Sequence, residues 1–101
     1  MEHAQTLGHQ LLDGLRAIQS EAQETVSFVR GLGLFAAMEL DLDATGWERL
    51  DAALSDRKVF VHARPRSGTL MVAPPINISE EDLTLGIDLI RASILATVQR
   101  S

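Results

Sequence analysis

The sequence lacks several features that would point to particular functions. It has no cysteine, which excludes disulfide bonds, thiolate metal sites and cysteine nucleophiles, and which is typical of a reducing compartment. It has no apolar run near the ~18 residues that a membrane span needs, and its first residues do not have the pattern of a signal peptide. Its net charge of −5 leads us to expect no nucleic-acid partner, because phosphate binding needs clustered cations, and the lack of a long apolar run leads us to expect no membrane partner.

The residues that are present indicate a small globular domain. Of the 101 residues, 46% are hydrophobic and 23% are charged, which is the balance of a folded chain rather than a disordered one. A chain of this length forms one domain with a thin core, or a piece of a larger protein. The absence of cysteine and of a targeting pattern leads us to expect a cytoplasmic location.

Three segments have the periodicity of amphipathic helices. The first covers residues 2–22, where leucine and isoleucine recur on one face. The second is predicted to begin near Thr45, because Thr45 and Glu48 have the spacing of a capping box, and to end near residues 55–57. The third follows Ser79, a favourable N-cap, and opens with acidic residues that suit the positive end of the helix dipole.

The segments between these helices have the features of β-strands. Residues 26–43 predict a short strand, a glycine bend over 31–33 and a longer alternating strand. Two further strands are predicted over 59–62 and 69–72, joined by a turn at 63–68 that contains proline and glycine. The order α-β-β-α-β-β-α predicts an α+β fold, with a small, mainly antiparallel sheet of three to four strands packed against helices.

Several possible functional motifs have a simpler structural explanation. Gly31 to Ala36 has the spacing of a dinucleotide-binding fingerprint, but we predict a strand after it instead of a long helix. Lys58, the one lysine, follows an arginine at the polar end of a helix, where a solvated side chain is expected. The histidines have no metal-ligand spacing and no serine lies in a nucleophile turn, so the sequence predicts neither a metal site nor a catalytic residue (His3, His9, His62).

Two arginines differ from the other charged residues in their setting. Arg64 and Arg66 flank Pro65 in the short connection before the last predicted strand. Guanidinium groups in such a loop can hold a carboxylate through two parallel hydrogen bonds. The alternative is that both side chains are solvated at a hairpin tip, and composition alone favours that alternative.

Two stretches in this order resemble one known family. VRGLGLFAAMEL (residues 29–40) and VFVHARPRSGTLMVAPPINISEEDL (residues 59–83) are similar to the C-terminal part of class III aminotransferases that depend on pyridoxal 5'-phosphate (PLP), the group that includes the omega-transaminases. The opening helix, from Ala4 to Leu15, is also similar. The resemblance covers nearly the whole chain and implies that residues 1–101 are a single domain, the C-terminal small domain of a larger aminotransferase.

The resemblance also implies what the parent enzyme does. Such enzymes transfer an amino group between an amine or amino acid and a keto acid such as pyruvate, through PLP. Their N-terminal large domain carries the Schiff-base lysine and most contacts to the cofactor, and they are homodimers with active sites at the subunit interface. This chain alone is therefore expected to be inactive and to bind no cofactor, and to expose an apolar patch where the large domain belongs.

One site residue can be carried over from the resemblance. Counting back from Ala73, Arg64 falls on the mobile arginine that binds the substrate carboxylate in omega-transaminases, with Arg66 as the local competitor. We expect its loop, flanked by proline and glycine, to move at modest cost. Ornithine-type relatives instead carry an arginine within the following strand, where this chain has Leu70-Met71-Val72. That difference favours an omega-transaminase type of substrate.

A second hypothesis belongs to a different class. The chain could be a free-standing α+β module that senses a ligand or dimerises through its sheet or its helices. Phe35, Trp47 and the glycines of the first helix would then lie at the interface. The upstream coding sequence separates the two hypotheses, because only the enzyme requires a long preceding domain with a strand-end lysine.

Overall fold

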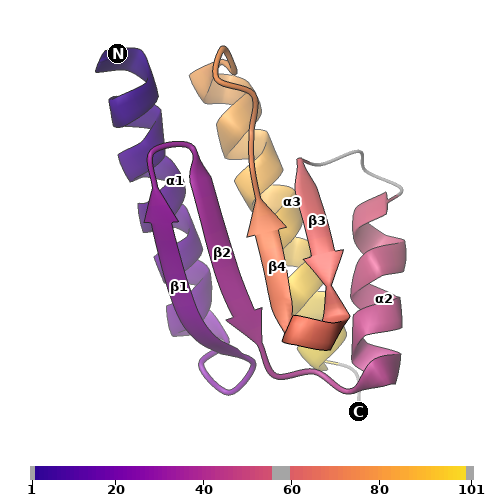
Figure 1. Cartoon of the computed structure of the whole chain (residues 1–101). Coiled ribbons are helices and arrows are strands. Elements are labelled where there is room, and N and C mark those ends of the chain that lie inside the picture. The colour runs from indigo at the N-terminus through magenta and orange to yellow at the C-terminus, as the bar shows by residue number, and fades with distance from the viewer. Residues whose placement is uncertain (1, 56–59, 100–101) are drawn as a thin grey trace.

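A sheet and three helices form two layers in the computed structural model, which describes residues 2–55 and 60–99 (Figure 1). The elements follow the predicted order: α1 (Glu2–Glu21), β1 (Val26–Leu32), β2 (Phe35–Leu40), α2 (Ala44–Ser55), β3 (Val61–Arg64), a 3-10 turn η1 (Pro65–Ser67), β4 (Thr69–Val72) and α3 (Glu80–Gln99). The predicted α+β class and element order are therefore confirmed. None of the helices in the described residues is long and apolar enough to cross a membrane.

The four strands lie in the order β1-β2-β4-β3, and every neighbouring pair is antiparallel. The sheet therefore has four strands, the larger of the two predicted numbers. Strands β1 and β3 form its two edges. In β4 the residue Thr69 pairs with Glu39 of β2 on one side and with Arg64 of β3 on the other. This register fixes which side chains of distant segments share a face of the sheet.

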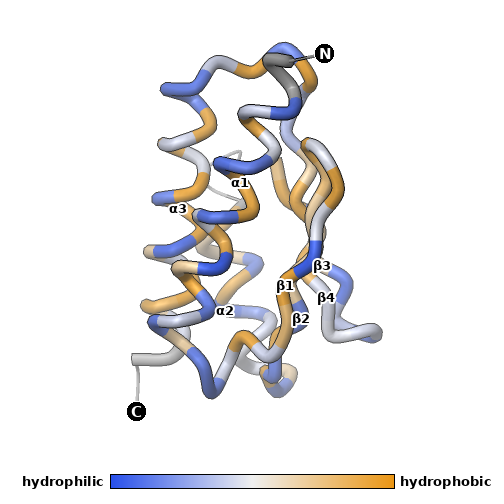
Figure 2. The backbone as a smooth tube through the Cα atoms, turned by 90° about the vertical axis from the view of Figure 1, so that its left-hand side faces the viewer, coloured by the Kyte–Doolittle hydropathy of each residue, from blue (hydrophilic) through white to orange (hydrophobic). Residues whose placement is uncertain are grey.

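The core lies between one face of the sheet and the helices (Figure 2). Leu11, Leu15 and Ile18 of α1 are fully buried, as are Ile90 and Ile94 of α3, so both predicted apolar stripes face inward. From the sheet, the buried side chains of alternate strand positions complete this core (Val29, Ala36, Met38, Leu70, Val72). Burial of these stripes is the main source of helix stability here, since α1 contains two glycines, each costing ~1 kcal/mol against alanine.

The glycines of α1 allow close packing. A Cβ atom at Gly8 would lie 2.6 Å from the carbonyl oxygen of Gly33, the turn residue of the β1–β2 hairpin. A Cβ atom at Gly14 would lie 2.9 Å from a methyl group of Ile87 in α3. The two glycines therefore contact other parts of this chain and are not left open for a partner. Trp47, which was also suggested for an interface, is only 5% exposed and belongs to the core.

The start of α2 differs from the prediction. The helix begins at Ala44, and the carboxylate of Asp43 accepts a hydrogen bond of 2.7 Å from the backbone N–H of Gly46. Asp43 is therefore the N-cap, and the predicted capping box of Thr45 and Glu48 is wrong, because the carboxylate of Asp43, two residues before Thr45, already accepts the hydrogen bond of the free Gly46 N–H group. The cap of α3 is confirmed, since Asp82 N–H donates to Ser79 Oγ at 3.0 Å.

Two strand boundaries also differ from the prediction. Strand β1 continues through Gly31, which pairs with Ala36, so the bend is confined to the turn around Gly33, whose φ is 61°. The supposed dinucleotide fingerprint is thus a β-hairpin in which the glycines lead into strand β2 and not into a helix. Strand β3 covers Val61–Arg64 instead of 59–62, which takes Arg64 out of the predicted turn and into the strand. Val59 and Lys58 lie outside the described residues.

Candidate functional site

The sheet has one face against the helices and one face without such a cover. Neighbouring residues along a strand point to opposite faces, and Leu70 and Val72 are fully buried toward the helices. The intervening strand residues therefore lie on the other face, which we call the open face. Its members, assigned from register and alternation, are Phe28, Arg30, Leu32, Phe35, Ala37, Glu39, His62, Arg64, Thr69 and Met71.

Arg64 is the last residue of β3 and points to the open face. It is exposed, and it is the Cα partner of Thr69 in β4. In the described part of the chain the guanidinium of Arg64 makes no ion pair, whereas Arg30 and Arg91 are each paired with a glutamate. Arg64 is thus a cation on the open face that is available to an anionic ligand.

The backbone that follows Arg64 is held by hydrogen bonds. Ser67 Oγ donates to the carbonyl oxygen of Arg64 at 3.2 Å, and Gly68 N–H donates to that of Pro65 at 3.1 Å. Gly68 has a φ of 69°, and its own carbonyl oxygen accepts a 2.8 Å bond from Leu40 N–H in β2. The segment expected to be a mobile loop is therefore a 3-10 turn tied by these hydrogen bonds.

Arg66, the predicted competitor, has a different setting. It is exposed on the 3-10 turn beyond the last pair of the β3–β4 ladder. No strand pairing directs it to the open face, so the two arginines that flank Pro65 lie in different settings.

Strand β4 contains the position at which an ornithine-type arginine would lie. Leu70 and Val72 are fully buried against the helices, whereas Met71 is half-buried on the open face opposite His62. Burying an unpaired guanidinium in the core would be very costly, so Met71 is the one position of the three that could carry an arginine. Residues 64 and 71 thus share the open face in adjacent strands.

Sequence reasoning missed an ion pair on this face. Arg30 Nη1 lies 2.6 Å from Glu39 Oε2, and the Arg30 guanidinium lies 5.8 Å from the centroid of the Phe28 ring. The predicted strand alternation over residues 26–43 indicates which side chains of each strand share a face of the sheet. To place Arg30 next to Glu39 one must also know which residues of the two strands pair, and the predicted glycine bend over residues 31–33 did not determine this pairing.

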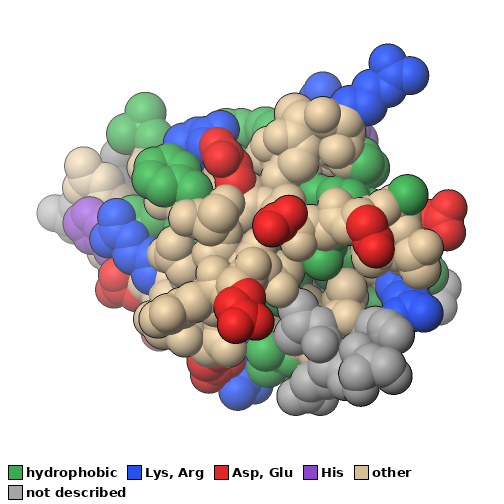
Figure 3. All heavy atoms as spheres, turned by 90° about the horizontal axis from the view of Figure 1, so that it is seen from below, with side chains coloured by type: hydrophobic (Ala, Val, Ile, Leu, Met, Phe, Trp, Pro, Cys, Tyr) green, Lys and Arg blue, Asp and Glu red, His purple; other side chains and the backbone are tan. Residues whose placement is uncertain are grey.

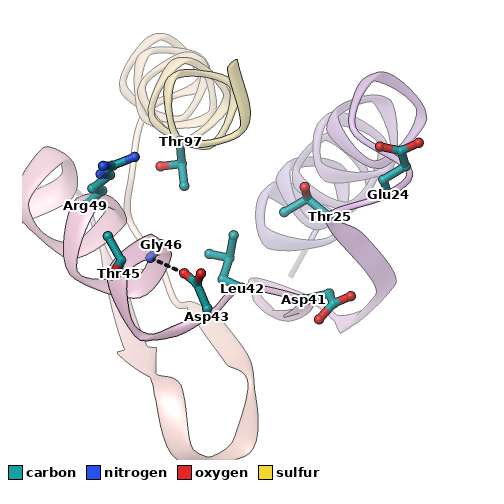
Figure 4. A pocket seen from close by; sticks show the side chains of 9 residues that line it. All are labelled: Glu24, Thr25, Asp41, Leu42, Asp43, Thr45, Gly46, Arg49 and Thr97. Carbon is teal, nitrogen blue, oxygen red and sulfur yellow. Dashed lines mark hydrogen bonds between the residues drawn. The ribbon is translucent and has the colours of Figure 1, made fainter. Parts of the chain in front are cut away.

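The described residues do not fit PLP by themselves. None of them is a lysine that could form a Schiff base with PLP. In the same residues no group of three side chains could hold a metal ion. A cleft between α2, α3 and the start of β1 is lined by Glu24, Asp41 and Asp43, and by Arg49 on the α2 side (Figure 4). Carboxylates are spread over this end of the molecule (Figure 3), and they disfavour a phosphate or a substrate carboxylate there. A PLP site would need residues beyond those described.

The comparisons with known proteins connect this fold to one group of enzymes. None of the protein-family models matches the chain. The chain is 34% identical to ornithine aminotransferase of Saccharomyces cerevisiae, over 92% of this chain and 22% of the relative. It is 31% identical to acetylornithine aminotransferase of a Nostoc species, over 97% of this chain and 23% of the relative.

Solved structures support the same relationship. The crystal structure of acetylornithine aminotransferase from Elizabethkingia anophelis superposes with a TM-score of 0.81 and 26% identity, over 94% of this chain and 25% of that chain. The chain therefore spans only about a quarter, or less, of the proteins that it matches. Over nearly its whole length the chain is similar to part of these aminotransferases, and it has the α+β fold of the C-terminal domain of class III transaminases.

Proposed function

We propose that residues 1–101 are one domain, the C-terminal small domain of a PLP-dependent enzyme that transfers an amino group between an amine or amino acid and a keto acid such as pyruvate. The names of the relatives support the aminotransferase activity, and the share of their length that this chain covers supports a larger parent enzyme. The observation that carries a role for this domain is Arg64 on the open face, which makes no ion pair with any of the described residues.

Arg64 would bind the carboxylate of the substrate. A guanidinium that donates two hydrogen bonds to a carboxylate contributes roughly 1.5–3 kcal/mol when water is excluded. Rotation of the side chain, on a backbone tied by Ser67 and Gly68, would let the same site admit an apolar amine. The hydrogen bonds of the turn, including the one from Ser67 Oγ to the Arg64 carbonyl oxygen, would hold the backbone while the guanidinium rotates between the two positions.

The type of amino donor has two candidates. The methionine at position 71 favours an omega-transaminase type of substrate, because the strand that carries an arginine in ornithine-type enzymes has none here. The curated relatives, in contrast, are named ornithine and acetylornithine aminotransferases. Assays of the parent enzyme with ornithine, acetylornithine, an omega-amino acid and a simple amine would separate these candidates.

The open face would meet the enzyme's own N-terminal large domain. Three large apolar side chains on it, Phe28, Leu32 and Phe35, are 50%, 86% and 47% exposed. An exposed group of this kind is typical of an interaction surface. The same apolar side chains would serve the alternative, a free-standing sensing or dimerisation module, and the parent is expected to be a homodimer.

The isolated chain is expected to be catalytically inactive and to hold no PLP, because the cofactor lysine would lie in the large domain. A cytoplasmic location stays an expectation from the lack of cysteine. Incubation of the 101-residue chain with PLP tests the first point. An imine absorbance that disappears in Lys58→Arg would contradict it.

The test of the Arg64 role is substitution in the full-length enzyme. Arg64→Ala should lower kcat/KM for keto acids and amino acids by about tenfold to a hundredfold, and should leave simple apolar amines nearly unchanged. Arg66→Ala is the matched control, since it removes an equal charge from the adjacent turn. Equal losses for acidic and apolar substrates would contradict the assignment.

A further inference from the structure

We propose that Arg30 is a positioning residue for the Arg64 site. By pairing with Glu39, Arg30 keeps that carboxylate away from Arg64 and leaves the Arg64 guanidinium available to the substrate. The inference rests on the proposed role of Arg64 and extends it to a second strand, because Arg30 acts through Glu39 and needs no contact with the substrate.

The register brings Glu39 and Arg64 to the same row of the open face. Both are Cα partners of Thr69, one in β2 and the other in β3. With neighbouring strands ~4.8 Å apart, their Cα atoms are separated by about 10 Å, which two long side chains can bridge. Among the strand residues of the open face, Glu39 is the one carboxylate.

Arg30 holds Glu39 from the opposite side. The Nη1–Oε2 distance is 2.6 Å, and the guanidinium also lies 5.8 Å from the Phe28 ring centroid, in the geometry of a cation–π contact. Arg30 and Phe28 both belong to β1, at the edge of the sheet farthest from β3. The carboxylate is therefore bound on the β1 side of β2, away from Arg64.

Loss of Arg30 would release a competing anion. A free Glu39 carboxylate could pair with Arg64, and a substrate carboxylate would then have to displace it. Exposed ion pairs of this kind change an equilibrium by about 1.5- to fivefold. The competition affects only substrates that need the Arg64 guanidinium, so it changes the ratio of KM values between acids and amines, an effect separate from the small loss of stability that follows removal of an ion pair.

The experiment is a double-mutant cycle in the full-length enzyme. Arg30→Met should raise KM for a keto acid by about two- to fivefold, with kcat and the KM for an apolar amine unchanged. Glu39→Gln should leave the keto-acid KM at or below the wild-type value. The double substitution should return it to near wild type, because the competing carboxylate is gone, and Arg30→Lys should retain a low KM.

Arg91→Met is the matched control. Arg91 pairs with Glu21 at the same 2.6 Å, with comparable exposure of the two side chains, but between α3 and α1. The hydrogen bond and charge of Glu21 raise the pKa of Arg91 above its usual value, so Arg91 stays charged at any assay pH. Its loss should lower stability about as much as loss of Arg30 and leave the KM ratio unchanged.

Three results would overturn the proposal. An unchanged keto-acid KM in Arg30→Met would show that Glu39 does not compete. Equal increases in Arg30→Met and Glu39→Gln without recovery in the double variant would show that the pair only ties β1 to β2. A shifted KM ratio in Arg91→Met would show that any lost ion pair has this effect. If Arg64→Ala itself spares keto acids, the proposed function fails first, and that result is distinguishable from these.

Discussion

Substituting Gly8 with alanine tests the packing that sets the position of the β1–β2 hairpin. In an exposed helix interior the change would stabilise the fold by ~1 kcal/mol, because alanine is the better helix former. Here a Cβ atom would lie 2.6 Å from the carbonyl oxygen and 2.7 Å from the carbonyl carbon of Gly33. These are backbone atoms, so relief requires the hairpin turn to move away from α1.

The expected net effect of Gly8→Ala is a loss of about 1 kcal/mol. Overpacking against a fixed neighbour costs about 1–3 kcal/mol, which exceeds the gain in helix propensity over most of that range. Gly14→Ala is the matched control in the same helix. Its Cβ would lie 2.9 Å from a side-chain methyl group of Ile87 and not from backbone, so this variant should lose less stability than Gly8→Ala.

Urea unfolding, followed by the fluorescence of the single buried tryptophan, Trp47, measures both variants. A Gly8→Ala chain that gains the full ~1 kcal/mol would refute the reasoning, because the hairpin would then not contact α1 at this point. A Gly14→Ala chain that loses as much as Gly8→Ala would show that close approach to backbone is not the deciding factor.

Two further predictions concern the helix cap and the two faces of β4. Asp43→Ala should lower the free energy of unfolding by about 1 kcal/mol through loss of the α2 cap, whereas Thr45→Ala should have little effect; equal losses in urea unfolding would contradict the assigned cap. Leu70→Ala should cost about 2–5 kcal/mol because the side chain is fully buried, whereas Met71→Arg should leave the fold intact. In the full-length enzyme Met71→Arg should also strengthen binding of acidic substrates, measured as a lower KM. Unfolding of this variant would contradict the assignment of Met71 to the open face.

The helices were predictable because their signals are local. The stripe of α1 and the Ser79 cap of α3 each depend on residues within a few positions of one another, and both are confirmed. Strand β4 was predicted with its observed limits, Thr69–Val72, since a glycine before it and prolines after it mark both ends.

The candidate site depended on information that local patterns do not contain. Arg64 could be selected from the sequence only through a family resemblance, and its place at the end of β3 follows from pairing with Thr69 in the next strand. The Arg30–Glu39 pair likewise requires the hairpin register. The cap at Asp43 was missed because Asp43 and Thr45 are both residue types that cap helices, and only the hydrogen bond from Gly46 N–H to Asp43 distinguishes them.

The most direct measurement of the central claim is a structure of the full-length enzyme with a keto acid or a carboxylate inhibitor bound. We predict that the open face of the sheet lines the substrate cleft and that the Arg64 guanidinium donates hydrogen bonds to the ligand's carboxylate. A ligand carboxylate held by other residues, with Arg64 directed into solvent, would contradict the account.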